Sequence, residues 1–137
     1  MSQVKDASLQ DRVIIVTGGV RGLGREMALE LAALGAKVVV TGASESDAMR
    51  ETISMANALG GEGRVLGIAA DVSSFAACES VLRFTLEKFG ALHVLVNNAG
   101  QGMRLISETF NTKPVPFWEI EPQHWSSIIG TNVNGVF

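Results

Sequence analysis

The stretch Thr17-Gly18-Gly19-Val20-Arg21-Gly22-Leu23-Gly24 decides the fold of this chain. A β-branched apolar run, Val13–Val16, precedes it, and a helical pattern of apolar residues continues from Leu23 to Leu34. A strand, a glycine-rich turn and a helix in this order present backbone N–H groups and a helix N-terminus to a phosphate. The stretch therefore predicts a turn that binds a nucleotide.

The composition fits one globular domain spanning residues 1–137. The chain is 47% hydrophobic, which suits a buried core, and its net charge of −3 gives no basis for binding nucleic acid or a membrane surface. No apolar run approaches the roughly 20 residues of a membrane span, and Met1–Asp6 lacks the features of a signal peptide. The single cysteine excludes an intrachain disulfide. We expect a cytoplasmic protein without a metal site.

Short apolar runs alternate with helix-length segments along the chain. The expected strands are 12–17, 37–41, 64–69 and 92–96, and the expected helices are 22–34, 45–59 and 74–89. Most of these runs are apolar at successive positions, which is typical of parallel strands covered on both faces. The alternation predicts right-handed βαβ units. The fold class is therefore α/β, a Rossmann-like doubly wound parallel sheet that is incomplete, with about four strands.

Finer expectations concern the helices. Ser44 and Ser73 are the expected N-caps of the second and third helices. The third helix carries an apolar stripe with the spacing of a core-facing surface. Its members are Phe75, Cys78, Leu82, Leu86 and Phe89.

The segment 101–121 carries two prolines and is interpreted as a long loop, a feature that is often functional. Phe117 and Trp118 within it are expected to pack rather than to line a pocket. A helix is expected to begin near Pro122, a good first-turn residue. Its expected inward residues are Trp125, Ile128, Ile129 and Val133.

The three spaced glycines of the turn have separate expected roles. Gly18 permits the tight turn, Gly22 lets the backbone approach a pyrophosphate, and Gly24 lets the helix pack close to the strand. The spacing is Gly-x-x-x-Gly-x-Gly, not the better-known Gly-x-Gly-x-x-Gly. A merely structural turn is the alternative, but the flanking strand and helix favour a dinucleotide site.

The end of the second strand indicates which dinucleotide binds. NAD sites place an acidic residue roughly 20 residues after the glycine motif, where it accepts from the ribose 2′-hydroxyl. Gly42 holds that place, while Arg21 and Ser44 can supply a charge and a hydrogen bond to a 2′-phosphate. A charge-assisted hydrogen bond contributes roughly 1.5–3 kcal/mol, and a tenfold preference needs about 1.4 kcal/mol. The sequence therefore favours NADP over NAD; the alternative is that Arg21 is a solvated surface residue.

Two further motifs follow strands. Asp71-Val72 lies where doubly wound sheets bind ligands, and Asp71 can accept from an adenine amino group. Its alternative role is a carboxylate favoured by a helix N-terminus. Asn97-Asn98-Ala99-Gly100 follows the fourth strand. Its small residues let a cofactor pass over the sheet edge, and its amides are expected to tie neighbouring loops.

Together these motifs resemble the short-chain dehydrogenase/reductase family. The matching motifs, in the family's order, are Thr17-Gly18-x-x-x-Gly22-x-Gly24, Asp71-Val72, Asn97-Asn98-Ala99-Gly100 and Asn132-Val133-Asn134-Gly135. The nearest likeness is to the NADP-dependent subgroup of β-ketoacyl carrier-protein reductases, which carry Arg or Lys where Arg21 stands. The predicted cofactor-binding residues are Gly18, Val20, Arg21, Gly22, Leu23, Gly24, Ser44, Asp71, Val72, Asn97, Ala99 and Gly100.

The resemblance also implies an activity. Members of the family interconvert a ketone and a secondary alcohol by hydride transfer, using an Asn-Ser-Tyr-Lys tetrad. Asn132 matches the tetrad Asn, which marks a helix distortion and holds a water that relays protons to the lysine. A small carbonyl or alcohol substrate is therefore expected, and the full-length form is expected to be a homo-oligomer.

The chain contains no tyrosine. The family's catalytic Ser and Tyr-x-x-x-Lys motif would lie beyond Phe137, and without them acid–base catalysis at a carbonyl has no agent. We therefore expect the cofactor-binding half of a reductase, truncated before the catalytic motif. The alternatives are an inactive nucleotide-binding or regulatory form and a non-functional remnant. His93 is expected to be structural, and 92–96 an exposed edge strand that makes the chain prone to aggregate.

Overall fold

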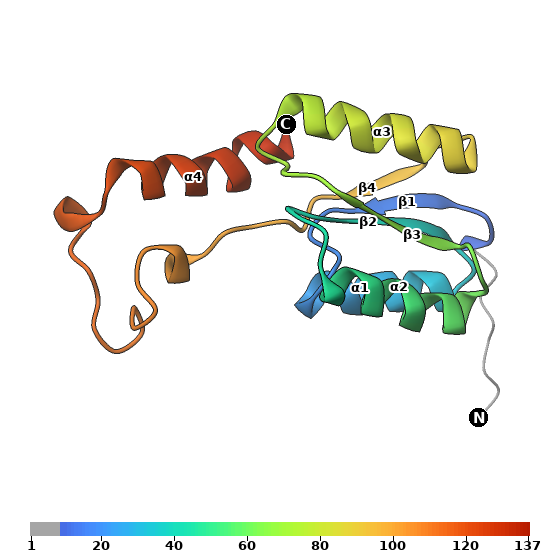
Figure 1. Cartoon of the computed structure of the whole chain (residues 1–137), viewed down its shortest axis with the longest axis horizontal. Coiled ribbons are helices and arrows are strands. Elements are labelled where there is room, and N and C mark those ends of the chain that lie inside the picture. Colours follow the sequence, from blue (N-terminus) through green and yellow to red (C-terminus); the bar gives the residue numbers. More distant parts are fainter. Residues whose placement is uncertain (1–8) are drawn as a thin grey trace.

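The computed structural model describes residues 9–137, so the expectation for Met1–Asp6 lies outside the described residues (Figure 1). It contains a four-stranded sheet in the order β3-β2-β1-β4, with every neighbouring pair parallel. The strands are β1 (Val13–Val16), β2 (Lys37–Gly42), β3 (Val65–Ala69) and β4 (Val94–Val96). The predicted α/β, Rossmann-like fold is confirmed.

Helices cover both faces of the sheet. The helices α1 (Gly22–Ala33) and α2 (Asp47–Gly60) lie on one face, and α3 (Phe75–Phe89) lies on the other (Figure 1). The helix α4 (Pro122–Asn132) extends away from the sheet and is followed by the single 3₁₀ turn η4 (Asn134–Val136). This arrangement leaves the carboxyl ends of the strands accessible between the two helical layers.

The core is split into two layers by the sheet. Ile14 and Val16 of β1 face α1 and α2, whereas Ile15 between them faces α3. Because successive side chains of a strand point to opposite faces, a strand covered on both sides must be apolar at every position. All four residues of β1 are buried, which explains its continuous apolar run.

The predicted inward stripe of α3 is wrong in part. Phe75, Leu82 and Leu86 are exposed, while Val81 and Thr85 are the buried residues of the helix. Thr85 tolerates burial because its hydroxyl donates to the Val81 carbonyl at 2.7 Å. Leu82 lines an apolar cavity together with Leu95 of β4, the strand at which the described sheet ends. Cys78 and Phe89 are half-buried.

Both predicted N-caps are also wrong by one or two residues. Ser46 caps α2 by accepting from the Met49 N–H at 3.2 Å, and Ser74 caps α3 by accepting from Ala77 at 3.3 Å. Ser44 lies in the preceding turn and is exposed. Serines cluster before both helices, so the cap is chosen by where the backbone turns and not by residue type alone.

The long loop 101–121 is confirmed, with the addition of two single 3₁₀ turns, η2 (Met103–Leu105) and η3 (Phe117–Glu119). Phe117 and Trp118 are exposed and contact each other edge to face, so their expected packing into a core is wrong. Within α4, Thr131 alone is buried, Ile128 and Ile129 are half-buried and Trp125 is exposed; Val133, just after the helix, is also exposed. The expected inward face is therefore wrong for Trp125 and Val133, because the helix extends past the sheet (Figure 1).

The strand β4 forms one edge of the described sheet, as predicted, and its Val94 and Leu95 are exposed. His93 precedes it and acts structurally, also as predicted. Its Nδ1 accepts a hydrogen bond from the Val13 N–H at 2.9 Å, and its own N–H donates to the Val13 carbonyl at 2.9 Å. The imidazole thus extends the pairing of β1 and β4 by one position.

Candidate nucleotide-binding site

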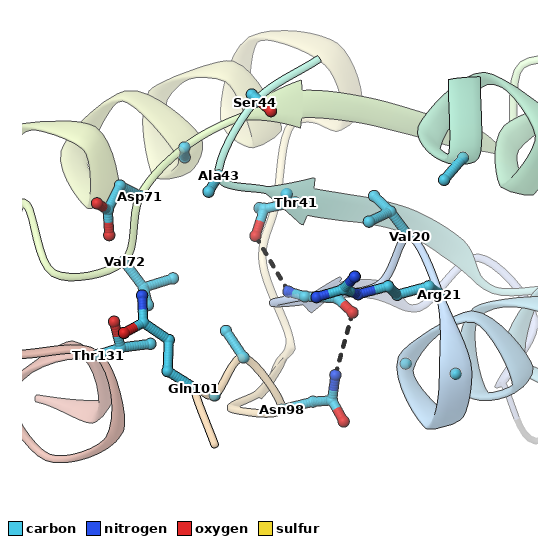
Figure 2. Close-up of a pocket in the computed structure, with 18 of the residues that line it drawn as sticks. Val20, Arg21, Thr41, Ala43, Ser44, Asp71, Val72, Asn98, Gln101 and Thr131 are labelled. Atoms are coloured by element: carbon cyan, nitrogen blue, oxygen red, sulfur yellow. Dashed lines mark hydrogen bonds between the residues drawn. The ribbon is translucent and has the colours of Figure 1, made fainter. Parts of the chain in front are cut away.

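A cavity of about 720 Å³ lies at the carboxyl ends of the strands (Figure 2). The glycine turn after β1, the turn after β2, the Asp71 turn after β3 and the loop after β4 contribute its walls. In the order β3-β2-β1-β4 the chain reverses direction across the sheet between β1 and β4. Doubly wound sheets bind their ligands at this reversal point.

The structure brings the predicted cofactor-binding residues together around this cavity, with one exception. Those that line it are Gly18, Val20, Arg21, Gly22, Leu23, Gly24, Ser44, Asp71, Val72, Ala99 and Gly100. The exception, Asn97, donates from its amide to the Val136 carbonyl at 3.3 Å and lines a separate apolar cavity of about 190 Å³.

Several other residues also line the cavity, and of these the sequence linked only Gly42 to the cofactor, as the small residue in place of a carboxylate. They are Thr41, Gly42, Ala43, Ser46, Ala48, Ala70, Asn98, Gln101 and Thr131. For Asn98 a usable pattern existed: neighbouring residues leaving a strand point to opposite sides, so Asn97 and Asn98 cannot both face the cavity. For Gln101 and Thr131 no local pattern exists, because α4 brings Thr131 to the site from a distant part of the chain.

The glycines of the turn are required for different reasons. Gly18 and Gly22 have positive φ angles of 63° and 54°, a conformation that favours glycine. A Cβ on Gly22 would meet nothing within 4 Å, so its backbone is open to the cavity. A Cβ on Gly24 would lie 2.4 Å from the Gly18 carbonyl oxygen and 2.5 Å from Asn98 Nδ2. Gly24 therefore allows close packing, as expected, but the start of α1 packs against the glycine turn and Asn98 and not against the strand.

A hydrogen-bond network joins the glycine turn to the loop after β4. The Thr17 hydroxyl accepts from the N–H groups of Asn98 and Ala99, both at 3.0 Å, and donates to the Val96 carbonyl at 3.3 Å. The Asn98 amide donates to the carbonyls of Thr17 at 3.0 Å and Gly18 at 3.2 Å. The expected tie between neighbouring loops is thus present, and it fixes two walls of the cavity relative to each other.

The start of α1 has the donor set of an anion site. Arg21 is its N-cap residue, and no side chain caps it, in contrast to Ser46 on α2 and Ser74 on α3. The N–H groups of a first helical turn have no intrahelical acceptor, and the first turn of α1 holds no acidic residue. Open N–H groups at the positive end of a helix dipole fit a pyrophosphate.

Two charged side chains line the cavity, and they lie apart (Figure 2). Arg21 is exposed and makes no ion pair or hydrogen bond through its guanidinium with residues 9–137. Asp71 accepts at Oδ1 from the N–H and the hydroxyl of Ser73, at 2.9 and 2.8 Å. Asp71 thus shapes the turn before α3 while also facing the cavity, so both interpretations of this residue are compatible with its position.

The end of β2 is closely covered by the glycine turn. A Cβ on Gly42 would lie 3.3 Å from both methyl groups of Val20. Packing therefore favours a small residue at position 42 for a reason independent of ligand charge. Ala43 and Ser44, the next two residues of the chain, also line the cavity (Figure 2).

Asn132 ends α4 and holds the loop after β4 from outside the cavity. Its Oδ1 accepts from the Gln101 N–H and its Nδ2 donates to the Gln101 carbonyl, both at 2.8 Å. The regular helix ends at this residue and the η4 turn follows; the helix distortion implied here by the family resemblance stays a prediction. Asn132 thereby fixes the backbone at Gln101, which does line the cavity.

Two negative findings apply to residues 9–137. None of their helices has the length and apolarity needed to cross a membrane. Nor do these residues bring three His, Cys, Asp or Glu side chains together in a group that could hold a metal ion.

Comparison with known proteins assigns the chain to a family. The short chain dehydrogenase model matches residues 12–137. The short chain dehydrogenase/reductase AstE of Aspergillus oryzae is 40% identical over 129 residues, which are 94% of this chain and 45% of that protein.

Two solved structures extend the comparison. A metagenomic short-chain oxidoreductase in complex with NADP is 32% identical with a TM-score of 0.78, and the match covers 93% of this chain and 52% of that one. The 3-ketoacyl-(acyl-carrier-protein) reductase of Brucella melitensis complexed with NADH is 33% identical with a TM-score of 0.73, covering 93% and 47%. The chain spans about half the length of these relatives. With its Rossmann-like sheet and this match from residue 12 to residue 137, the chain belongs to the short-chain dehydrogenase family of oxidoreductases.

Proposed function

We propose that this chain is the cofactor-binding part of an NADP-dependent reductase that interconverts a ketone and a secondary alcohol. The observation that carries the proposal is the uncapped start of α1 beside Arg21, facing a β2 end that holds Gly42 where NAD sites hold a carboxylate. Related structures with NADP and with NADH support a nicotinamide cofactor. Arg21 in the glycine turn, together with Gly42 in place of a carboxylate, supports the phosphorylated form of the cofactor, NADP.

The lining residues divide the cavity by chemistry. The N–H groups at Gly22, Leu23 and Gly24 would hold the pyrophosphate, and Arg21 with Ser44 would hold the 2′-phosphate. Asp71 and Val72 would face the adenine, and Ala99 and Gly100 would leave space over the ends of β1 and β4. The bound cofactor would supply or accept the hydride. The network of Thr17 and Asn98 keeps these walls in place before binding, which limits the ordering cost.

Asn132 has a positioning role in this proposal. It matches the Asn of the family's tetrad, and its side chain holds the Gln101 backbone by two hydrogen bonds of 2.8 Å. A proton relay to a substrate oxygen would require the Tyr and Lys of the tetrad, and this sequence of 137 residues has no tyrosine. The composition also supports a cytoplasmic location, and we propose a homo-oligomer for the full-length form.

The NADP assignment gives a direct prediction. NADPH is expected to bind about tenfold more tightly than NADH, and Arg21→Ala is expected to remove most of that difference, because one charge-assisted hydrogen bond accounts for about this factor. Neither tryptophan lines the cavity, so isothermal titration calorimetry is the suitable measurement.

The matched control for Arg21→Ala is Arg50→Ala. Arg50 is an exposed arginine on α2 that pairs with Asp47 and does not line the cavity. It should leave both affinities unchanged. Equal binding of NADPH and NADH by the unmodified chain would contradict the assignment.

The missing tyrosine gives a second prediction. The chain of 137 residues should bind NADPH without oxidising it in the presence of ketone substrates, because it has no tyrosine, the residue that would protonate the developing alkoxide in the family's tetrad. Loss of NADPH absorbance over time measures this. A preparation of the Gly24→Ala variant, purified in the same way, controls for contaminating reductases. Turnover present with the unmodified chain and absent with the variant would show that the tetrad is not needed.

A nucleotide-binding protein without catalysis is the second candidate function. The absence of tyrosine from the sequence favours it over an enzyme made of this chain alone. The coding sequence downstream of Phe137 separates the candidates. An in-frame Ser and Tyr-x-x-x-Lys would support the reductase, and an authentic stop codon would support the binding protein.

A further inference from the structure

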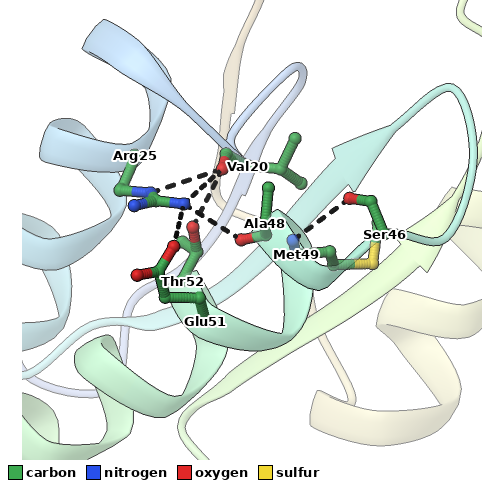
Figure 3. Close-up of polar contacts among 7 residues, drawn as sticks. All are labelled: Val20, Arg25, Ser46, Ala48, Met49, Glu51 and Thr52. Carbon is green, nitrogen blue, oxygen red and sulfur yellow. Dashed lines mark hydrogen bonds and ion pairs between the residues drawn. The ribbon is translucent and has the colours of Figure 1, made fainter.

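Arg25 connects the glycine turn to α2 through one partly buried guanidinium (Figure 3). Its Nε and Nη2 donate to the Val20 carbonyl at 3.3 and 3.2 Å, and Nη2 also donates to the Ala48 carbonyl at 3.3 Å. Nη2 further pairs with Glu51 Oε2 at 2.9 Å. Arg25 itself does not line the nucleotide cavity, so it could act there only through the residues that it holds.

The Val20 carbonyl is the focus of these contacts. It also accepts from the hydroxyl of Thr52 at 3.0 Å, and Thr52 is completely buried in α2. Because a trans peptide is planar, its C=O and the following N–H point in opposite directions. Fixing the Val20 carbonyl against α2 therefore directs the Arg21 N–H away from α2. It also fixes the point from which the Arg21 side chain leaves the turn.

The hydrogen bond from Arg25 to the Ala48 carbonyl holds the start of α2. Ala48 lies in the first turn of that helix and lines the cavity together with the cap residue Ser46 and with Ser44 before it. By holding Val20 and Ala48 at once, Arg25 sets the distance between the turn that carries Arg21 and the start of α2, which Ser46 caps and which Ser44 precedes. These are the two walls at which a 2′-phosphate would be distinguished from a 2′-hydroxyl.

We propose that Arg25 is a positioning residue for nucleotide discrimination, which it achieves by locking the Val20–Arg21 peptide against the first turn of α2. The inference rests on the proposed function, since it assigns a cause to the preference for NADPH. Arg21 and Ser44 then favour NADPH over NADH only while the hydrogen bonds from Arg25 to the Val20 and Ala48 carbonyls are intact. Thr52 donates to the same Val20 carbonyl and is therefore a second positioning residue.

The test compares Arg25→Met with Arg64→Met in the 137-residue chain. Arg64 is a close match for Arg25: it donates to a carboxylate, Asp11, at 3.0 Å and to a backbone carbonyl, Gly35, at 2.9 Å. The side-chain exposures are also similar, 20% for Arg25 and 26% for Arg64. The contact is tight enough that Arg64 holds the pKa of the Asp11 carboxyl below its usual value. Arg64 differs in lying at the opposite end of the sheet, away from the cavity.

We expect both methionine variants to lower the melting temperature, since each removes a bridging guanidinium. Arg25→Met alone should lower the ratio of NADPH to NADH affinity, by at most the factor of about ten that one charge-assisted hydrogen bond carries. Titration calorimetry with each nucleotide gives the ratio, and it does not depend on enzyme activity. Arg64→Met should keep the ratio of the unmodified chain.

Two milder variants test the same contact in a fold that is less disturbed. Arg25→Lys keeps the charge but cannot reproduce the forked donation to two carbonyls, so it should give an intermediate ratio. Thr52→Val removes the second donor to Val20 at constant shape and should also lower the ratio. If Arg25→Met does not fold, these two variants decide the question.

The outcomes separate this inference from the proposed function. If the unmodified chain prefers NADPH and the Arg25 and Thr52 variants keep its ratio, Arg25 only stabilises the α1–α2 contact and the inference is overturned. If the unmodified chain binds both nucleotides equally or binds neither, the proposed function fails and this inference fails with it. A reduced ratio in Arg25→Met together with an unchanged ratio in Arg64→Met supports both.

Discussion

Replacing Gly24 with alanine is expected to abolish binding of both NADPH and NADH and to lower the free energy of unfolding by about 1–3 kcal/mol. The added Cβ would lie 2.4 Å from the Gly18 carbonyl oxygen and 2.5 Å from Asn98 Nδ2. The first atom belongs to the backbone, and the second is held by hydrogen bonds to the carbonyls of Thr17 and Gly18. The start of α1 would have to move, and its open N–H groups would move with it.

Gly130 provides the matched control for this substitution. It also lies inside a helix, and a Cβ there would meet only Ser73 Cβ, at an ordinary contact distance of 3.6 Å. Gly130→Ala should stabilise the chain by about 0.5–1 kcal/mol, the usual gain of alanine over glycine in a helix. Urea denaturation and titration calorimetry measure the two effects. A Gly24→Ala protein as stable as the Gly130→Ala protein would contradict the close contact at the turn.

Thr17→Val is expected to cost about 1–3 kcal/mol of stability, because it removes the acceptor of two backbone N–H groups, of which only that of Asn98 keeps another acceptor, the Val96 carbonyl at 3.1 Å. These groups belong to Asn98 and Ala99, each 3.0 Å from the Thr17 hydroxyl, and Thr17 is buried. Valine has nearly the same shape, so the loss comes from hydrogen bonding and not from packing. The loop after β4 would loosen, and the affinities for NADPH and NADH would fall together.

Thr17→Ser separates the hydroxyl from the methyl group. Serine keeps the hydroxyl, so its cost should be limited to about 0.8 kcal/mol for the lost methyl group. Chemical denaturation compares the three proteins. If serine is as destabilising as valine, the hydroxyl is not what joins the turn to the loop.

The sheet could be predicted because its central strands obey a simple physical rule. A strand covered on both faces reads as a continuous apolar run, and both β1 and β2 are almost completely buried. The glycine turn could be predicted for a similar reason, since positive φ angles and a close contact leave glycine as the favoured residue at Gly18, Gly22 and Gly24.

The buried face of α3, by contrast, could not be predicted correctly from the sequence. Its apolar residues cover more than one side of the helix, and which side is inward depends on where the sheet ends. Val81 faces the sheet, while Leu82 lies next to it in sequence and is exposed beside β4. A hydrophobicity pattern does not contain the position of the sheet edge, and so it assigned Leu82 to the core.

The hydrogen bonds that hold the glycine turn against α2 could not be predicted from the sequence, for a different reason. Val20, Arg25 and Thr52 meet at one carbonyl group although Thr52 is 32 residues from Val20. Neither Arg25 nor Thr52 belongs to a recognisable motif, because their partner is a backbone atom that every residue possesses. Contacts of this kind follow from the packing of α1 on α2 and are visible only in three dimensions.

The pair formed by Asn132 and Gln101 has a consequence for how this protein can change over evolutionary time. Two hydrogen bonds of 2.8 Å join residues 31 positions apart, so the intervening arm of loop and helix is anchored at its base. Closing a loop twice as long costs only about 0.6 kcal/mol more. Insertions and deletions in the arm are therefore inexpensive and remain local, so this segment can diversify while the glycine turn stays in register.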